Sequence, residues 1–85
     1  MKFQGAVIRE HGVTFSIVVV KANVIQSSSR ASDAISSFTP VFRTPVVLMA
    51  QDGRGKPTYY GRPDIANFMA SVPAHAIPWR EYTLN

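Results

Sequence analysis

The chain has 85 residues, of which 46% are hydrophobic and 16% are charged, and it contains no cysteine. This length allows one domain, over residues 1–85, and the hydrophobic fraction is too high for an intrinsically disordered chain. Because cysteine is absent, disulfide bonds, thiolate metal sites and thiol catalysis are excluded. Nine basic against five acidic side chains give a net charge of +4, which permits an acidic partner without requiring one.

The beginning of the chain and its apolar runs predict a soluble protein. The first five residues do not resemble the apolar region of a secretory signal. The continuous apolar runs, Ile17 to Val20 and Val46 to Ala50, are far shorter than the ~20 residues of a membrane span. We therefore expect a cytoplasmic protein that does not associate with membranes.

The first part of the chain predicts a β-hairpin. Residues 3–9 alternate loosely between apolar and polar side chains, and a Glu-His-Gly sequence then provides a tight turn. Residues 13–20 are rich in β-branched side chains, as a returning strand would be. Residues 21–26 allow two interpretations, because they can extend this strand as far as Ile25 or bend out of it.

A serine cluster and an apolar stripe predict the first helix. The serines at 27–29 offer side-chain oxygens that can cap a helix beginning near Arg30. Apolar side chains then recur at positions i, i+3, i+4 and i+7, which indicates a core-facing side. These side chains are Ala31, Ala34, Ile35 and Phe38. Pro40 is expected to end the helix one or two residues earlier.

The remaining elements are two short strands, a second helix and a tail. Residues 46–50 are a continuous apolar run that predicts a buried strand. After a glycine-rich turn, residues 57–60 predict a short strand near a sheet edge, because a proline at its start cannot donate to a ladder. Residues 61–64 open the second helix. Residues 74–85 are too apolar to be free, so we expect a packed tail, with a short strand as one form of it.

These elements predict a single small α+β domain in the order ββαββα. Two hairpins and two amphipathic helices bury their apolar sides most simply when the helices cover a sheet. We expect a mixed four-stranded sheet with both helices on one face and the C-terminal tail docked on the domain.

Residues 44–71 resemble the C-terminal half of thioredoxin-fold proteins. The matching motifs are the Thr-Pro dipeptide at 44–45, the strand 46–49, the Asp-Gly turn at 52–53, the strand 58–60 and Gly61 before a helix. In that family the proline before the strand is cis, which implies a cis bond before Pro45. The family's redox cysteines have no counterpart here, and its first strand-helix-strand unit is replaced by a hairpin. The resemblance therefore implies a local topology and no redox activity.

Metal binding and catalysis lack a supporting constellation of residues. The two histidines, His11 and His75, have no second ligand at metal-binding spacing, so neither a metal site nor a cofactor is predicted. None of the serines lies in a Gly-x-Ser-x-Gly elbow, and the carboxylates are spread over turns, helix starts and the tail. These observations favour a protein without enzymatic activity, and an enzyme of unknown class stays a third hypothesis.

Two segments have the composition of an anion or nucleic-acid site. At 27–30, serine hydroxyls, the N–H groups of a helix N-terminus and a guanidinium suit a phosphate, although ordinary capping explains the same residues. Around the second hairpin, basic side chains and tyrosines suit single-stranded nucleic acid, although they also suit a solvated turn. The candidates are Arg43, Arg54, Lys56, Tyr59, Tyr60, Arg62, Ser27, Ser28, Ser29 and Arg30.

Apolar side chains exceed what a small sheet needs to cover. In the second strand and the tail they are Val18, Val20, Ile77, Trp79, Tyr82 and Leu84, which we take as candidate interface residues. An open sheet also leaves unpaired edges. Self-association would bury both, and so would a tail folded back within one chain. The leading hypothesis is a binding or assembly module, as a homodimer or with a protein partner, and the alternative is anion or nucleic-acid binding.

Overall fold

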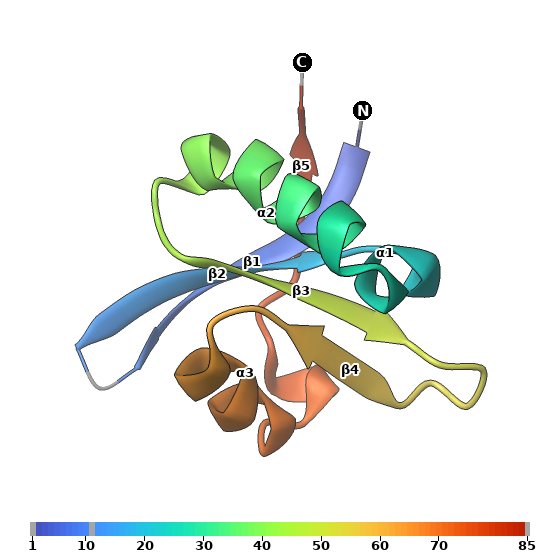
Figure 1. Ribbon diagram of the computed structural model, residues 1–85. Coiled ribbons are helices and arrows are strands. Elements are labelled where there is room, and N and C mark those ends of the chain that lie inside the picture. Colours follow the sequence, from blue (N-terminus) through green and yellow to red (C-terminus); the bar gives the residue numbers. More distant parts are fainter. Residues whose placement is uncertain (1, 11, 85) are drawn as a thin grey trace.

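A mixed five-stranded sheet with helices on both faces forms the protein, in a computed structural model that describes residues 2–10 and 12–84 (Figure 1). The strands are β1 (Lys2–Glu10), β2 (Val13–Val19), β3 (Val46–Gln51), β4 (Pro57–Tyr60) and β5 (Arg80–Thr83). The helices are α1 (Ala22–Gln26), α2 (Ser28–Phe42), α3 (Pro63–Ala70) and the short 3-10 helix η1 (Ala74–Ala76). The α+β class and the mixed sheet are confirmed.

The strand order β4-β3-β2-β1-β5 combines two hairpins with one parallel pair. β1 and β2 pair antiparallel, as do β3 and β4, and the helices α1 and α2 connect β2 to the parallel strand β3. β4 lies at one edge of the sheet, as its proline predicts. The predicted four-stranded sheet is wrong, because the tail contributes a fifth strand that pairs antiparallel with the beginning of β1. The tail is therefore part of the sheet, in the short-strand form that was one of the forms expected for it.

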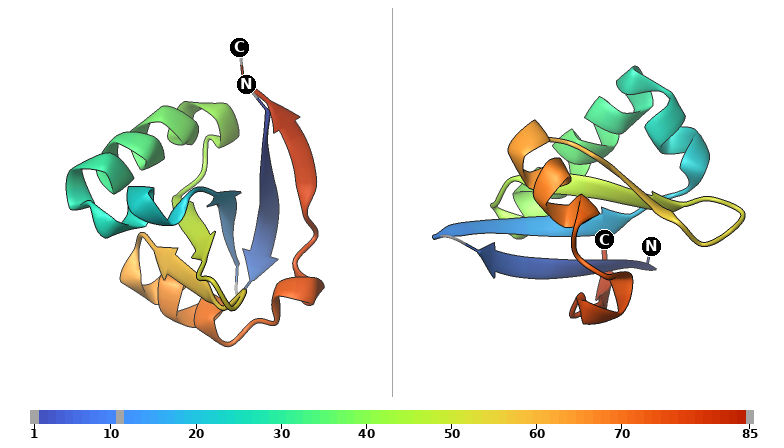
Figure 2. Two further views of the ribbon diagram at one scale, coloured as in Figure 1. Left: turned by 90° about the vertical axis from the view of Figure 1, so that its right-hand side faces the viewer. Right: turned by 90° about the horizontal axis from the view of Figure 1, so that it is seen from below.

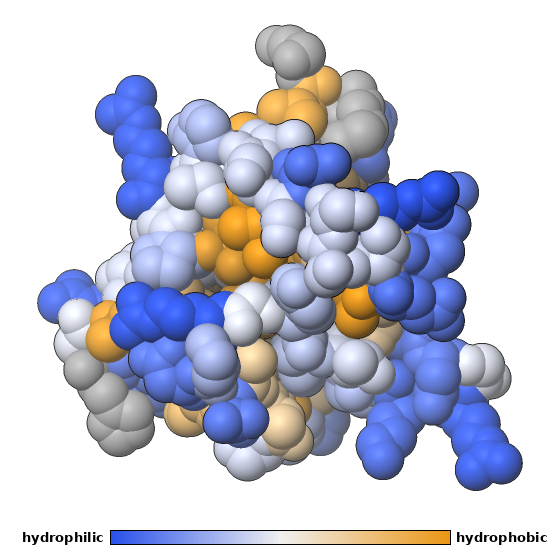
Figure 3. All heavy atoms as spheres, viewed as in Figure 1, coloured by the Kyte–Doolittle hydropathy of each residue, from blue (hydrophilic) through white to orange (hydrophobic). Residues whose placement is uncertain are grey.

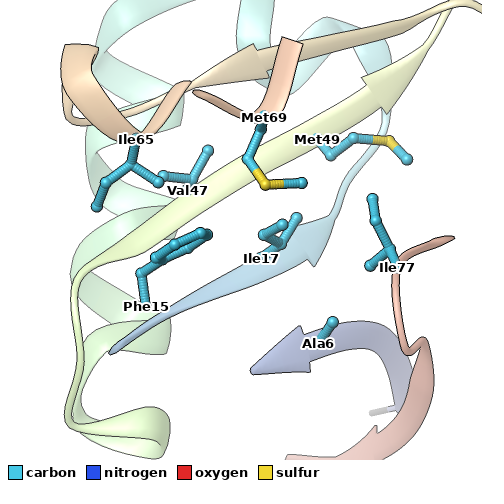
Figure 4. Close-up of a cluster of buried hydrophobic side chains, with 8 residues drawn as sticks. All are labelled: Ala6, Phe15, Ile17, Val47, Met49, Ile65, Met69 and Ile77. Carbon is cyan, nitrogen blue, oxygen red and sulfur yellow. The ribbon is translucent and has the colours of Figure 1, made fainter. Parts of the chain in front are cut away.

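The two main helices lie on opposite faces of the sheet (Figure 1). Side chains of β3 alternate between the faces: Val46 and Leu48 belong to the cluster of α2, whereas Val47 and Met49 belong to that of α3. The prediction that both helices share one face is wrong. A strand that is apolar at every position needs cover on both sides, so α3 packs on the face that the β2–α2–β3 crossover leaves bare. Figure 4 shows the buried side chains on the α3 face.

Residues 22–26 bend out of the sheet and form α1. α2 begins directly afterwards, and Ser27 is its cap, because the Ser27 hydroxyl accepts a hydrogen bond from the Arg30 N–H at 3.4 Å. The Ser27 hydroxyl also lies 3.2 Å from that of Ser29. The capping role predicted for the serine cluster is thus confirmed for its first member.

α2 continues through Pro40 to Phe42, so the prediction that this proline ends the helix is wrong. The helix ends one residue later, where Arg43 takes a left-handed conformation with a φ of 58°. The last turn of the helix brings the Phe42 ring edge-on against the rings of Phe3 and Tyr82, at centroid distances of 6.0 and 5.1 Å. Packing in the last turn thus outweighs the backbone hydrogen bond that a proline removes.

A hydroxyl pair and a backbone hydrogen bond attach the beginning of β3 to β2. The Ser16 side chain is fully buried, and its hydroxyl lies 2.7 Å from that of Thr44. The Ser16 N–H donates to the Pro45 carbonyl at 2.9 Å. The strand, turn, strand and helix expected within residues 44–71 are present. The cis bond that the resemblance implies before Pro45 is not, because every peptide bond among the described residues is trans.

Candidate functional site

The outer side of β1 is paired along only part of its length. β2 pairs with residues 5–10 of β1, whereas β5 pairs with residues 2–5 and no further. Within the described residues, the side of residues 6–10 that faces away from β2 therefore has no strand partner. We call this segment the open edge. Figure 2 shows β5 beside the first part of β1, with the preceding chain turning away towards η1.

The tail leaves the edge open because its side chains are needed in the core. Ile77 is buried against the α3 face, so the chain must pass beneath the sheet before it can form β5 (Figure 4). Two hydrogen bonds hold this turn: the Trp79 backbone N–H donates to the Ile77 carbonyl at 2.8 Å, and its indole N–H to the Ala74 carbonyl at 3.2 Å. Pro78, the residue before Trp79, has no N–H group to donate to a strand ladder. The chain reaches the plane of the sheet only at Arg80.

A mainly apolar groove of about 360 Å³ runs beside the open edge. Residues 7–10 form one wall, Phe68 and Val72 at the end of α3 form the other, and residues 76–78 close one side. α3 has only eight residues, which is too short to extend over β1. A second hollow of about 130 Å³ adjoins the groove, because Glu10 and Phe68 line both. Side chains of a partner would therefore meet apolar walls here.

The charges at the open edge are available to a partner. Arg9 and Glu10 are exposed, and neither forms an ion pair with another described residue. Asp64, which lines the adjoining hollow, is held by Arg62 at 2.8 Å. The hydrogen bond from Arg62 lowers the pKa of Asp64, and the same bond raises the pKa of Arg62. The carboxylate of Glu10 is thus the one near the groove that has no cationic partner among the described residues.

Val7 is the most exposed large apolar side chain of the described residues, with 46% of its surface accessible. It lies in the middle of β1, directly after the buried Ala6. The next is Val41 on α2, at 41%. An exposed valine on an unpaired strand favours association, because natural sheets usually protect such edges with charge, proline or a covering element.

The structure places the candidate interface residues in or against the core. Val18 and Ile77 are buried, and the other four, Val20, Trp79, Tyr82 and Leu84, pack against the two core clusters. Tyr82 stacks on Phe3 with a centroid distance of 5.5 Å. The side chains that line the groove, Phe68 and Val72 among them, were not singled out from the sequence. Their helical spacing is that of core residues, and only the shortness of α3 hints that they are incompletely covered.

The basic candidates of the second hairpin are divided between its two ends. β3 and β4 are antiparallel, so Arg43 and Arg62 flank one end of the hairpin, whereas Arg54 and Lys56 lie in the turn at the other. In that turn, the Asp52 carboxylate accepts the Lys56 and Arg54 N–H groups at 2.9 and 2.8 Å. These bonds, that from Lys56 first, lower the pKa of Asp52. In Figure 3, hydrophilic side chains extend outward from this turn.

The two tyrosines do not share a surface. Tyr59 packs against the cluster on the α3 face and Tyr60 against the cluster on the α2 face. The Tyr59 hydroxyl is buried without a hydrogen-bond partner among the described residues, and burial raises its pKa. Stacked bases would need both rings on one open side, which the alternation of β4 prevents.

One end of the sheet brings two predicted segments together. A hollow of about 140 Å³ lies between α1 and the end of β3, lined by Gln26 on one side and Asp52 on the other. The capped beginning of α2, with Arg30, and the turn that carries Arg54 and Lys56 therefore share this end (Figure 1).

No protein-family model, curated protein or solved structure matches the chain. In the part of the chain that the structure describes, no three histidine, aspartate or glutamate side chains are grouped so that they could hold a metal ion. His75 lies in η1, and His11 lies outside the described residues. No helix within residues 2–10 and 12–84 has the length and apolar character of a membrane span.

Proposed function

We propose that the protein is a small assembly module that binds a second copy of itself through the open edge of β1 and catalyses no reaction. The observation that carries this proposal is the unpaired outer side of residues 6–10, next to an apolar groove. Unpaired N–H and C=O groups of an edge strand are a template for pairing with another strand. The groove adds apolar area that a paired strand would cover.

The composition of the open edge supports pairing. Its first three residues, Ala6, Val7 and Ile8, include no proline and no charge, and the charged residues Arg9 and Glu10 come only at its end. The added ladder is short, so we expect an interface at or below ~1,200 Å² and a dissociation constant in the micromolar range. Dimerisation should therefore depend on concentration.

Light scattering across a size-exclusion column, at loading concentrations from ~1 to ~500 μM, tests the proposal. The wild-type chain should change from monomer to dimer within this range. Val7→Lys should remain monomeric, because a lysine on an edge strand opposes pairing. Val41→Lys is the matched control, because it changes the other exposed valine and should dimerise like the wild type. A wild-type chain that is monomeric throughout would refute the proposal.

Anion binding is the second candidate function, at the end of the sheet where α2 begins. It is supported by the hollow that Gln26, just before the beginning of α2, and Asp52, in the turn that carries Arg54 and Lys56, line together. A mixed oligonucleotide should then bind at low salt and be released as salt increases. Arg54→Ala/Lys56→Ala should weaken this binding, whereas Lys2→Ala/Arg80→Ala, with the same net charge at the opposite edge, should not. Equal losses in both variants would indicate nonspecific attraction only.

A further inference from the structure

We infer that the open edge also binds an acidic strand of another protein, in which two carboxylates separated by one apolar residue face Arg9 and Arg80. Such a partner goes beyond the proposed self-association, which would use the same edge, and neither depends on the other. Three features of the edge support it: the direction of its backbone groups, the cationic charge on one face of the sheet and the apolar groove on the other.

Two residues of the open edge direct their backbone groups outward. The Ser16 N–H donates to the Pro45 carbonyl, just before β3, so the peptide groups of Ser16 point away from β1. Directly opposite residues of an antiparallel pair exchange both hydrogen bonds or none, so the N–H and C=O of Val7, the partner of Ser16, point away from β2. Alternation gives Arg9 the same orientation. A partner strand would therefore form its ladder hydrogen bonds with Val7 and Arg9.

The charged side chains on the α2 face of this edge are all cationic. Phe3 belongs to the α2-face cluster, so alternation along β1 places Val7 and Arg9 on this face. Tyr82 packs against the same cluster, which places Arg80, two residues earlier in β5, on this face as well. Arg9 and Arg80 are exposed, and neither forms an ion pair with another described residue. The positions that β1 and β5 present on this face include no carboxylate.

A partner residue opposite Val7 would lie between the two arginines. Arg80 is opposite Gly5, so a strand that continues the line of β5 places its residue opposite Val7 two positions, or ~7 Å, from Arg80. The same residue is the diagonal neighbour of Arg9, at ~7–8 Å. A glutamate at this position can meet both guanidinium groups, and a second glutamate directly opposite Arg9 adds a closer pair. The face therefore suits acidic residues two positions apart.

The α3 face of the edge suits an apolar side chain between these two acids. The residue between them would be opposite Ile8, which packs against the α3-face cluster and lines the groove. Phe68 and Val72 form the other wall of this groove. One position further, a basic residue would be opposite Glu10, which is exposed and without a cationic partner among the described residues. An antiparallel partner therefore reads basic, acidic, apolar, acidic from its N-terminus.

A second copy matches these charges less well than an acidic strand does. In an antiparallel pair of copies, the α2-face residues of the two β1 strands lie opposite each other, because directly opposite side chains share a face. The charged residue that β1 of a second copy brings to this face is Arg9, which like charges oppose. An acidic strand should therefore bind more tightly than a second copy and displace it from the edge.

A fluorescein-labelled peptide with the core Lys-Glu-Val-Glu between serines tests this inference. Fluorescence anisotropy at low salt, with the protein varied up to ~500 μM, should show saturable binding to the wild-type chain. A control peptide with the order Lys-Glu-Glu-Val has the same composition but cannot place both acids on one face, so it should bind about tenfold more weakly. No saturation with the first peptide, or equal affinity for both, would overturn the inference.

Charge reversal at exposed positions tests the contact with the two arginines. Arg9→Glu and Arg80→Glu should each weaken peptide binding about tenfold, because attraction becomes repulsion. Arg30→Glu, at the exposed beginning of α2, is the matched control and should change the affinity by less than about threefold. Circular dichroism checks that the three variants fold alike. Equal losses in all three would indicate nonspecific attraction and overturn the inference.

N-methylation of the peptide distinguishes an added strand from contact between charges alone. A methyl group on the N atom of the glutamate opposite Val7 removes a ladder hydrogen bond and should weaken binding about tenfold. The same group on the valine opposite Ile8, whose N–H points away from the protein, should have less than about a threefold effect. Equal effects would overturn strand addition.

Light scattering separates this inference from the proposed function. An excess of the peptide should convert wild-type dimers into monomers, because both partners use the open edge. A chain that dimerises but does not bind the peptide would overturn this inference alone. A chain that binds the peptide but is monomeric at every concentration would support it and refute the proposed self-association.

Discussion

The two faces of the sheet are covered by helices of very different length. α2 has 15 residues, and its aromatic side chains reach across to the outer strands, where Phe38 and Phe42 meet Phe3 and Tyr82. α3 has eight residues, and beside β1 it leaves a groove of about 360 Å³. The apolar stripe of a helix thus predicts that the helix covers a face of the sheet, whereas the length of the helix decides how much of that face is covered. The self-association that we propose uses the part of the sheet that the shorter helix leaves uncovered.

Truncating one phenylalanine on each face should give the largest contrast in stability. Phe38 is 7% exposed and its ring lies 4.8 Å from that of Phe3, so Phe38→Ala should lower the free energy of unfolding by ~3–5 kcal/mol. Phe68 is only partly buried, so Phe68→Ala should lower it by ~1–2 kcal/mol. Urea denaturation followed by circular dichroism measures both. Equal losses would mean that the α3 face is as closely packed as the α2 face.

Adding one methyl group tests how tightly the α2 face is packed. A Cβ atom at Gly5 would lie 2.9 Å from the Ile17 carbonyl oxygen, so Gly5→Ala should destabilise the protein by ~1–3 kcal/mol. At Gly53 a Cβ atom would meet nothing within 4 Å, so Gly53→Ala should change stability by less than ~0.5 kcal/mol. Thermal melts of both variants make the comparison. A tolerated Gly5→Ala would show that the strand can shift.

The paired hydroxyls of Ser16 and Thr44 on the α2 face should stabilise the fold, because each is the hydrogen-bond partner of the other. Ser16→Ala and Thr44→Val each leave one hydroxyl without its partner at 2.7 Å, and each should lower stability by ~1–2 kcal/mol. The double variant should lose less than the sum, because no orphaned hydroxyl remains. Strict additivity in chemical denaturation would contradict a direct hydrogen bond.

The α3 face contains the opposite case, a buried hydroxyl without a partner. Tyr59→Phe removes this hydroxyl and should leave stability unchanged or raise it by up to ~1 kcal/mol, because the variant no longer buries an unsatisfied polar group. The same substitution at Tyr60 is the control. A clear loss of stability in Tyr59→Phe, measured by the melting temperature, would show that the hydroxyl has a partner in solution.

The smallest effect is expected at the β3–β4 turn, outside both faces. Because hydrogen bonds to Asp52 lower its pKa in the folded state, its ionised form stabilises the turn. This contribution is fully present above the unfolded pKa, near 3.8, and is lost as the pH falls through the lower folded value. The melting temperatures of the wild type and Asp52→Asn should therefore differ at neutral pH and converge in acid. A difference that persists in acid would contradict the assignment.

Much of the secondary structure follows from short segments of the sequence. The β1–β2 hairpin, the buried strand β3 and the beginning of α3 carry their own turn residues, β-branched runs and helix-start signals, so no distant contact is needed to predict them. The end of α2 could not be predicted in this way, because contacts of Phe42 with Phe3 and Tyr82 outweigh the local effect of Pro40.

The candidate site depends on contacts that are distant in the chain. The sequence predicts that a small open sheet leaves unpaired edges, but the position of the open edge depends on where the tail rejoins β1, at Arg80 opposite Gly5. That register is decided by burial of Ile77 on the α3 face, which draws the chain beneath the sheet. Composition, strands and helix stripes were thus readable in the sequence, since each reflects local geometry and burial. Only the tertiary structure decides which face each helix covers and which edge stays open, because segments that are far apart in the chain pack against the same sheet.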